Sequence, residues 1–341
     1  MIKKIDFPRP IVLVSKCLEF ENVRYNGQLV RSQIVRDLMP LVDFVKVCPE
    51  CDIGMGVPRD PIRIVKKGGD YRLVQPGTGE DLTDRMDAFT DAFLASLGDV
   101  DGFIFKSGSP TIGIRNIKVY AGTEMAPVIE KGAGFFAKKI LAKYAGFPME
   151  EDDRLRNYRI RSHFLTQLFT FADLRAVRMS GSLERLEEFH KKNMFMFLFY
   201  DSVTYGKMCD LLADNGSAGY EDTVRIVSSY ETLLKRLMRK PGSCESRIAV
   251  ARNMLSRFHE AISSGEKEYY ENMFANYREN RIGEDALTEV LRLSVVRYGG
   301  EDIGDQTILY PYPETLRVPC DEKRDKDYWA DQEEPGPGQK E

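Results

Sequence analysis

The feature that constrains this chain most is an apolar run, residues 42–47, that ends abruptly in Cys48-Pro49-Glu50-Cys51. β-branched residues are frequent in the run, which is typical of a buried strand. The proline and two nearby glycines then impose a rigid turn. Ligands of open α/β sheets bind beyond the carboxyl ends of strands. We therefore expect this turn, with its two thiols and one carboxylate, to lie at the functional centre.

Two other apolar runs end in a similar way. Residues 11–14 lead to Cys17, and residues 102–105 lead to Lys106-Ser107-Gly108-Ser109. Helical spacing of apolar residues over 81–97 places a helix between strands, and strands that alternate with helices indicate a parallel or mixed sheet. We predict a Rossmann-like α/β domain over residues 1–150, with Cys17, Cys48, Cys51 and Ser109 at one edge.

Other patterns extend this domain and bring it to an end. Residues 63–65 and 71–74, joined across a Gly-Gly turn, predict a β-hairpin. From residue 151 the strand pattern gives way to helical periodicity, so we predict an all-α domain over 151–320 that includes one long helix from 183 to about 212. The charged, Pro- and Gly-rich tail, residues 321–341, is predicted to be disordered.

Composition narrows the class of protein. The formal net charge of −4 excludes a uniformly basic nucleic-acid binder. No apolar run reaches the length of a membrane span, and the N-terminus lacks a signal-peptide profile, so we predict a cytoplasmic protein with no membrane partner. Six cysteines in 341 residues are too sparse for a disulfide scaffold. They are expected to be metal ligands, catalytic thiols or core residues.

Two local groups of basic residues indicate contact with a polyanion such as RNA, although solvated helical faces would give the same pattern. The first group begins the helical half, and the second lies about 80 residues further along. The predicted RNA-binding residues are Arg154, Arg156, Arg159, Arg161, Lys235, Arg236, Arg239 and Lys240.

The residues near the turn also have alternative interpretations. Cys48 and Cys51 could bind a metal, form a thioredoxin-type redox pair or be small buried residues. Glu50 could serve chemistry or could cap a helix or pair with Arg59. Ser109, which precedes a proline, could be only a turn residue.

Several motifs together resemble a known family. Ser15-Lys16-Cys17-Leu18, Arg24-Tyr25-Asn26-Gly27, Val47-Cys48-Pro49-Glu50, Gly56-Val57-Pro58-Arg59 and Lys106-Ser107-Gly108-Ser109-Pro110 occur in this order. They resemble the desulfidases that act on thiouracil and on 4-thiouridine in tRNA. The resemblance covers residues 8 to 150, and the second half resembles the helical accessory domain, of unknown function, that is fused to the tRNA-directed members.

The resemblance implies a function, a cofactor and roles for residues. It implies a [4Fe–4S] cluster held by three cysteines, whose open iron binds the thiocarbonyl sulfur as a Lewis acid while water replaces that sulfur without net redox. The expected substrate is a thiolated pyrimidine, in particular 4-thiouridine in tRNA. Glu50 and Ser109 would be catalytic. The expected substrate-binding residues are Arg24, Arg59, Lys106 and Ser107.

The chain departs from the family motif at one position. The family has Ser-Pro-Ser-Cys-Gly, whereas this chain has Ser109-Pro110-Thr111-Ile112-Gly113, and an isoleucine cannot bind iron. We predict that Cys51 replaces the missing ligand and binds the cluster with Cys17 and Cys48. The alternatives are zinc or no metal, a degenerate, non-catalytic protein that binds RNA or a metal, and a thiol–disulfide oxidoreductase that uses Cys48 and Cys51. The sequence leaves the oligomeric state open.

Overall fold

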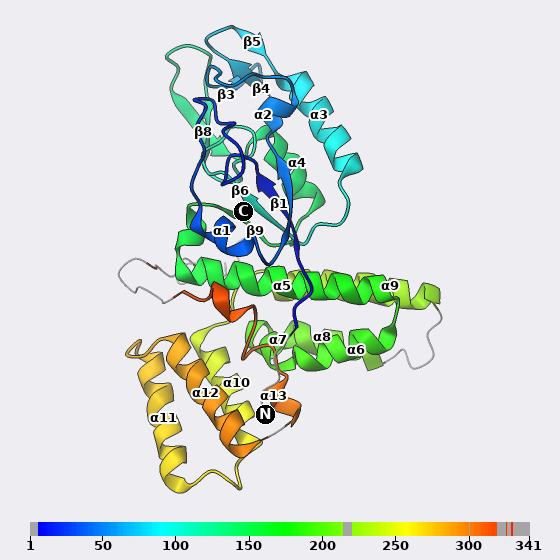
Figure 1. Cartoon of the computed structure of the whole chain (residues 1–341), viewed down its shortest axis with the longest axis vertical. Helices are drawn as coiled ribbons and strands as arrows, with labels where there is room; N and C mark the ends of the chain where they lie inside the picture. The colour runs from blue at the N-terminus through cyan, green and yellow to red at the C-terminus, as the bar shows by residue number, and fades with distance from the viewer. Residues whose placement is uncertain (1–5, 214–219, 300, 319–324, 326–328, 330–341) are drawn as a thin grey trace, which may run out of the picture. The chain divides into compact units, whose positions relative to one another are not determined.

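The computed structural model describes residues 6–213, 220–299, 301–318, 325 and 329 (Figure 1). These residues form two compact units. The α/β unit comprises residues 8–156 and 167–172. The helical unit comprises residues 157–166 and the described residues from 173 onward, together with residues 6 and 7.

The α/β unit is built on a four-stranded parallel sheet. Its strands are β1 (Ile11–Ser15), β2 (Asp43–Val47), β6 (Gly102–Phe105) and β9 (Met149–Glu151), in the order β2-β1-β6-β9. Central strands β1 and β6 are almost wholly buried, as expected of parallel strands covered on both faces. Because the four strands run in one direction, their carboxyl ends lie at one edge. This confirms the predicted fold class for the first half of the chain.

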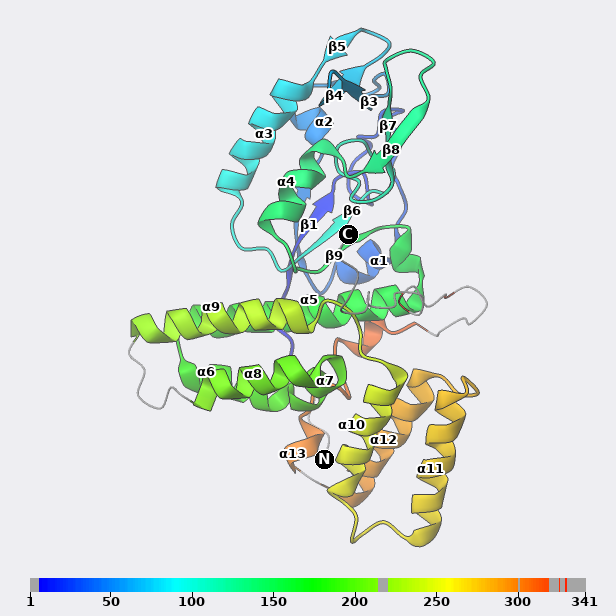
Figure 2. The same ribbon diagram turned by 180° about the vertical axis from the view of Figure 1, so that it is seen from behind.

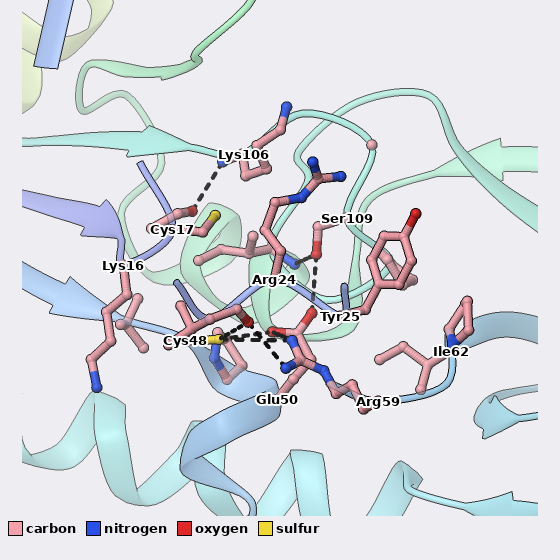
Figure 3. A pocket seen from close by; sticks show the side chains of 18 of the residues that line it. Lys16, Cys17, Arg24, Tyr25, Cys48, Glu50, Arg59, Ile62, Lys106 and Ser109 are labelled. Carbon is pink, nitrogen blue, oxygen red and sulfur yellow. Dashed lines mark hydrogen bonds and ion pairs between the residues drawn. The ribbon is translucent and has the colours of Figure 1, made fainter. Parts of the chain in front are cut away.

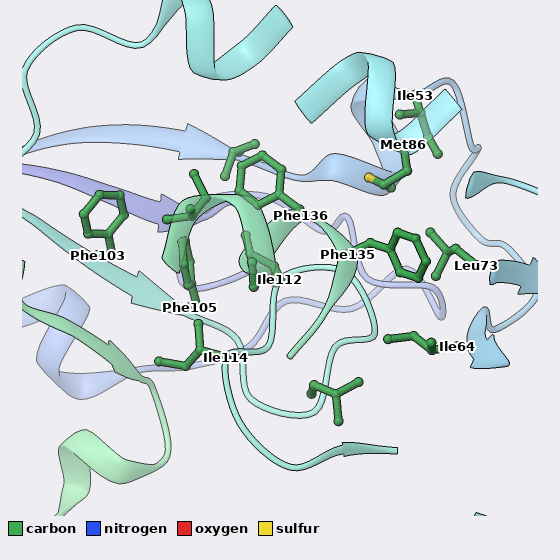
Figure 4. Packing of buried hydrophobic residues seen from close by; sticks show 14 of the residues in the cluster. Ile53, Ile64, Leu73, Met86, Phe103, Phe105, Ile112, Ile114, Phe135 and Phe136 are labelled. Atoms are coloured by element: carbon green, nitrogen blue, oxygen red, sulfur yellow. The ribbon is translucent and has the colours of Figure 1, made fainter. Parts of the chain in front are cut away.

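Four helices accompany this sheet: α1 (Gln33–Leu38), α2 (Pro49–Asp52), α3 (Thr83–Ser96) and α4 (Phe135–Lys143). Helices α3 and α4 lie side by side, as Figure 2 shows, and Lys139 of α4 pairs with Asp91 of α3 at 2.8 Å. The apolar faces of these helices pack against the sheet. Phe136 of α4 and Phe103 and Phe105 of β6 belong to the same hydrophobic cluster (Figure 4). The packing of these aromatic rings holds the helices against the sheet.

A second sheet extends the same unit. It contains β5 (Glu80–Asp81), β4 (Asp70–Gln75), β3 (Arg63–Lys67), β7 (Ile117–Tyr120) and β8 (Val128–Gly132), in that order. The predicted hairpin is confirmed, because β3 and β4 pair antiparallel. Both sheets share one hydrophobic cluster, which includes Leu13 from the first sheet and Ile64 from the second. The apolar periodicity did not predict β5, β8 or β9, because these strands are short or exposed.

The helical unit contains no strand among its described residues, which confirms the predicted all-α second half. A short 3-10 turn, η1 (Arg154–Arg156), precedes the long helix α5 (Tyr158–Ser180), of which residues 167–172 group with the α/β unit. The helices that follow are α6 (Leu183–Lys192), α7 (Met194–Tyr200), α8 (Ser202–Ala213), α9 (Tyr220–Leu237), α10 (Cys244–Ser256), α11 (Ser264–Arg278), α12 (Glu284–Tyr298) and α13 (Glu301–Gly304), with η2 at Glu314–Leu316.

The prediction of one long helix from 183 to about 212 was wrong. Asn193 ends α6, and its buried side chain donates to the Phe189 carbonyl at 2.8 Å and accepts from Thr307 at 2.6 Å. Asp201 then begins α8 by accepting from the backbone amides of Val203 and Thr204. Side-chain capping competes with helix continuation, and two such residues divide the segment into three helices.

Of the predicted disordered tail, only Asp325 and Trp329 belong to the described residues. Asp325 is 3% exposed and accepts from the backbone amide of Tyr158 at 2.9 Å, at the start of α5. The ring of Trp329 meets that of His163 edge to face. These two positions have defined contacts, and the rest of the tail that was predicted to be disordered lies outside the described residues. None of the described helices has the length and apolar character needed to cross a membrane.

Candidate functional site

A pocket of about 290 Å³ opens at the carboxyl ends of β1, β2 and β6 (Figure 3). Each of these strands is followed by a turn that contributes side chains to the pocket wall, which is the arrangement expected of a parallel sheet. The predicted site residues that line it are Cys17, Arg24, Cys48, Glu50, Arg59, Lys106, Ser107 and Ser109. Most of the residues that the sequence singled out around the turn therefore line one cavity.

Glu50 stands at the centre of the polar contacts in this pocket. Helix α2 begins two residues after the end of β2, and Glu50 is its second residue. The Glu50 side chain is buried. One carboxylate oxygen accepts from Thr111 Oγ1 at 2.6 Å and from Ser109 Oγ at 3.3 Å. The other accepts from the Cys48 thiol at 3.6 Å. These contacts hold the carboxylate in one orientation toward the pocket.

The two thiols of the pocket are held in their protonated form. Burial, followed by the nearby Glu50 carboxylate, raises the pKa of Cys17 to about 11. The same two causes raise the pKa of Cys48 well above its usual range. Both effects disfavour the thiolate form of these two cysteines. A metal ion would reverse this balance, because metal binding stabilises the deprotonated sulfur.

Cys51 does not line the pocket, although its thiol lies close to that of Cys48. Its thiol accepts from Arg59 Nη1 at 3.6 Å and donates to the Val23 carbonyl at 3.9 Å, the same carbonyl that the Cys48 thiol contacts. Ile112, which occupies the place of the usual third ligand, does line the pocket and is 3% exposed. The structure thus places two thiols and one isoleucine where the family motif predicts three thiols.

The donor set as arranged does not make a three-thiolate site for a cluster. Over the described part of the chain, no group of three or more His, Cys, Asp or Glu side chains is arranged to hold a metal ion. Cys17 and Cys48 carry suitable donors for iron, but Cys51 is not part of the pocket lining that contains these two.

Cationic groups surround the pocket. Lys106 pairs with Asp152 at 3.1 Å, and Lys16 pairs with Asp52 at 3.3 Å. Arg59 is almost buried, donates to the Val23 carbonyl at 3.0 Å and approaches Glu50 at 4.0 Å. Arg24 lies at the pocket wall, with its guanidinium 5.6 Å from the Tyr25 ring centre. This positive lining suits a substrate or intermediate that carries negative charge.

Sequence reasoning missed two residues of the site. Thr111 is fully buried and makes the shortest hydrogen bond to Glu50. Its signal was the second hydroxyl of Ser109-Pro110-Thr111, two residues before Gly113. Asp152 holds Lys106, but it comes from a segment interpreted as a polar domain junction, and no local pattern links two residues that are 46 positions apart.

The predicted RNA-binding residues differ in how far they are exposed to solvent. Arg161 is buried and donates to the Leu316 carbonyl at 3.3 Å, so its prediction as an RNA contact is not supported. Arg154 pairs with Glu150 at 3.0 Å, and Lys235 pairs with Glu231 at 2.6 Å. Exposed positions are held by Arg156, Arg159, Arg236, Arg239 and Lys240.

Comparisons with known proteins identify the family of the α/β unit. A family model described as 2-thiouracil desulfurase matches residues 12–152, and a model of a protein of unknown function, DUF1722, matches residues 195–313. The uncharacterized protein YbbK of Bacillus subtilis (strain 168) is 30% identical over 154 residues, which are 43% of this chain and 99% of that protein. The chain belongs to the 2-thiouracil desulfurase family through its α/β unit.

One solved structure also matches. It is the [4Fe-4S]-dependent thiouracil desulfidase TudS, which is 26% identical to this chain. The match covers 43% of this chain and 94% of that one, with a TM-score of 0.33.

Proposed function

We propose that this protein removes the sulfur of a thiolated pyrimidine and replaces it with oxygen from water, with 4-thiouridine in tRNA as the expected substrate. The observation that carries the proposal is the buried Glu50 carboxylate, which lines a pocket with two thiols and accepts hydrogen bonds from two hydroxyls. Membership of the 2-thiouracil desulfurase family supports the reaction class.

The reaction is a hydrolysis that needs no electrons. Water adds to the thiocarbonyl carbon, the carbon–sulfur bond breaks, and the products are the oxo-pyrimidine and hydrogen sulfide. Glu50 is the residue best placed to orient the water and accept its proton, because its carboxylate is buried yet open to the pocket. Ser109 lies 3.3 Å from that carboxylate and can donate to the pyrimidine or to the departing sulfur.

Cations next to the thiols complete this chemistry. Negative charge develops on the sulfur as the carbon–sulfur bond breaks, and fixed positive groups stabilise such charge in a dry pocket. Lys106 and Arg24 line the pocket, and Arg59 is held beside Glu50. We assign substrate binding and charge stabilisation to these three residues.

A [4Fe–4S] cluster bound by Cys17, Cys48 and Cys51 remains our proposed cofactor, with zinc or no metal as the alternatives. The thiol donors favour iron, and so do the positions of Cys17 and Cys48 in the pocket. The position of Cys51 outside the pocket lining weighs against it.

The helical unit is proposed to bind tRNA. Support comes from the exposed Arg236, Arg239 and Lys240, which lie at the end of α9 and just beyond it. Arginine forms two parallel hydrogen bonds with phosphate, which suits a backbone contact. A location in the cytoplasm, where tRNA resides, accords with this proposal.

The proposal is tested by comparing substrates. Protein reconstituted anaerobically with iron and sulfide is incubated with 4-thiouracil, 4-thiouridine 5′-monophosphate and thiolated tRNA, and released sulfide is measured. We expect sulfide from at least the tRNA, and a lower rate on tRNA alone when Arg236, Arg239 and Lys240 are changed to glutamine. No sulfide from any of the three would instead favour the non-catalytic binding protein.

A further inference from the structure

The fourth strand of the parallel sheet, β9, leads into an acidic pair, Glu151 and Asp152, which contacts the two ends of the loop formed by residues 106–115. β9 lies next to β6, and the Asp152 amide continues the pairing by donating to the Phe105 carbonyl at 2.9 Å. Glu151 ends the strand, and Asp152 follows it. Both side chains are buried, at 5% exposure each, which is unusual for carboxylates unless they are paired.

Asp152 makes two contacts with the start of the loop. Its Oδ1 accepts from the Ser107 amide at 2.9 Å and from Lys106 Nζ at 3.1 Å. The same ammonium group also donates to Ser107 Oγ at 2.7 Å. One buried carboxylate oxygen therefore fixes both the lysine that lines the pocket and the backbone of the next residue.

Glu151 holds the other end of the loop. Its Oε1 accepts from the amides of Ile114 and Arg115, at 2.9 and 3.2 Å. The segment between these anchors contains Ser109 and Thr111, the two hydroxyls that contact Glu50. Gly108, with φ of 72°, supplies the left-handed turn inside the segment, which a side chain would strain.

We propose that Asp152 is a positioning residue of the desulfuration site, which acts through Lys106 and the turn that leads to Ser109. This inference rests on the proposed function. The neutral variant Asp152→Asn keeps an oxygen acceptor for the Ser107 amide but removes the charge that holds Lys106. The variant Asp152→Ala removes both contacts.

Kinetics of variants separate positioning from a purely structural role. Because Lys106 faces charge that develops during the reaction, Asp152→Asn is expected to lower kcat by about tenfold to 100-fold, with a smaller change in KM. In a Lys106→Met background the same change is expected to have little effect, because its target is gone. Equal effects in both backgrounds, or no effect in either, would overturn the proposal.

The double variant also guards against misfolding. Asp152→Asn alone leaves a largely buried ammonium group without its carboxylate, which destabilises the fold, whereas the double variant removes both partners. Asp153→Asn is the matched control, because Asp153 is adjacent and exposed. We expect it to behave as the wild type in rate and in thermal unfolding.

A second measurement needs no turnover, so it distinguishes failure of this inference from failure of the proposed function. Hydrogen exchange of residues 106–112 is followed by mass spectrometry in the wild type, Asp152→Ala and Asp153→Ala. We expect exchange at least about tenfold faster in Asp152→Ala alone, since Ser107 loses its acceptor. Unchanged exchange would show that Asp152 does not hold the turn, whatever the protein catalyses.

Discussion

At the level of single residues, the sequence predicted those pocket residues that lie just after a buried strand. Cys17, Cys48 and Ser109 could be placed together because parallel strands end at one edge. Thr111 and Asp152 could not, because their partners lie 61 and 46 positions away and depend on tertiary packing. The placement of Cys51 outside the lining likewise depends on Arg59, whose position no local pattern predicts.

Thr111 is expected to support Glu50. Changing Glu50 to Gln removes the base and is predicted to lower sulfide release by at least about 100-fold. Thr111→Val removes the 2.6 Å hydrogen bond at similar volume and is predicted to cost about tenfold. Thr111→Ser keeps the hydroxyl and serves as the control. Full activity in Thr111→Val would show that this hydroxyl does not orient the carboxylate.

The proposed ligand set makes a prediction about metal content. If Cys51 is the third thiolate, Cys51→Ser should lose iron as fully as Cys17→Ser does, whereas Cys244→Ser in the helical unit should not. Iron and acid-labile sulfide are measured after anaerobic reconstitution, with the visible spectrum as a second readout. Full iron content in Cys51→Ser would contradict its role, and a gain in Ile112→Cys would identify position 112 as the site of the missing ligand.

At the scale of elements, strand and helix types were predictable where periodicity was strong. The apolar runs of β1, β2 and β6 and the hairpin of β3 and β4 could be predicted from the sequence. Strand β9 could not, because it has only three residues and its acidic sequence is typical of a linker. The break of 183–212 into α6, α7 and α8 follows from Asn193 and Asp201, polar residues whose capping role depends on where their side chains point.

The start of α4 provides a test of how one element supports the site. A Cβ on Gly134 would lie 2.4 Å from the Thr111 carbonyl carbon and oxygen, so the backbone would have to move. We expect Gly134→Ala to destabilise the fold by about 1–3 kcal/mol and to lower activity. A Cβ on the nearby Gly132 would meet nothing within 4 Å, which makes Gly132→Ala the control. Chemical denaturation and sulfide release provide the measurements, and equal behaviour of the two variants would contradict this packing.

At the scale of the whole molecule, the sequence predicted an α/β unit followed by a helical one, but not what the helical unit does. The α/β half has motifs whose chemistry can be argued from thiols and carboxylates. The helical half has amphipathic periodicity and scattered basic residues, which specify a bundle without specifying a ligand. The proposal that it binds RNA therefore rests on exposed charge at the end of α9.

The helical unit is expected to lose stability in mild acid. Burial lowers the pKa of His190 to about 4 and that of His163 to about 3. The unfolded chain binds these protons near pH 6.5 and the folded chain does not, so stability falls as the pH drops below about 6.5 toward these lower values.

Helical circular dichroism during thermal unfolding, recorded from pH 7 to pH 5, measures this loss. The decline in Tm should be smaller in His190→Gln and His163→Gln. It should be unchanged in His259→Gln, because that side chain is 70% exposed. An identical decline in all four proteins would show that the buried histidines do not govern it.

The most direct test of the central claim is the origin of the oxygen in the product. The reconstituted protein is incubated with 4-thiouridine tRNA in H₂¹⁸O without an electron donor, and the nucleosides and sulfide are quantified by mass spectrometry and colorimetry. Hydrolytic desulfuration at this pocket predicts uridine that carries ¹⁸O, equimolar sulfide, and loss of both in Glu50→Gln. Uridine without ¹⁸O, a requirement for a reductant, or undiminished turnover in Glu50→Gln would contradict the account.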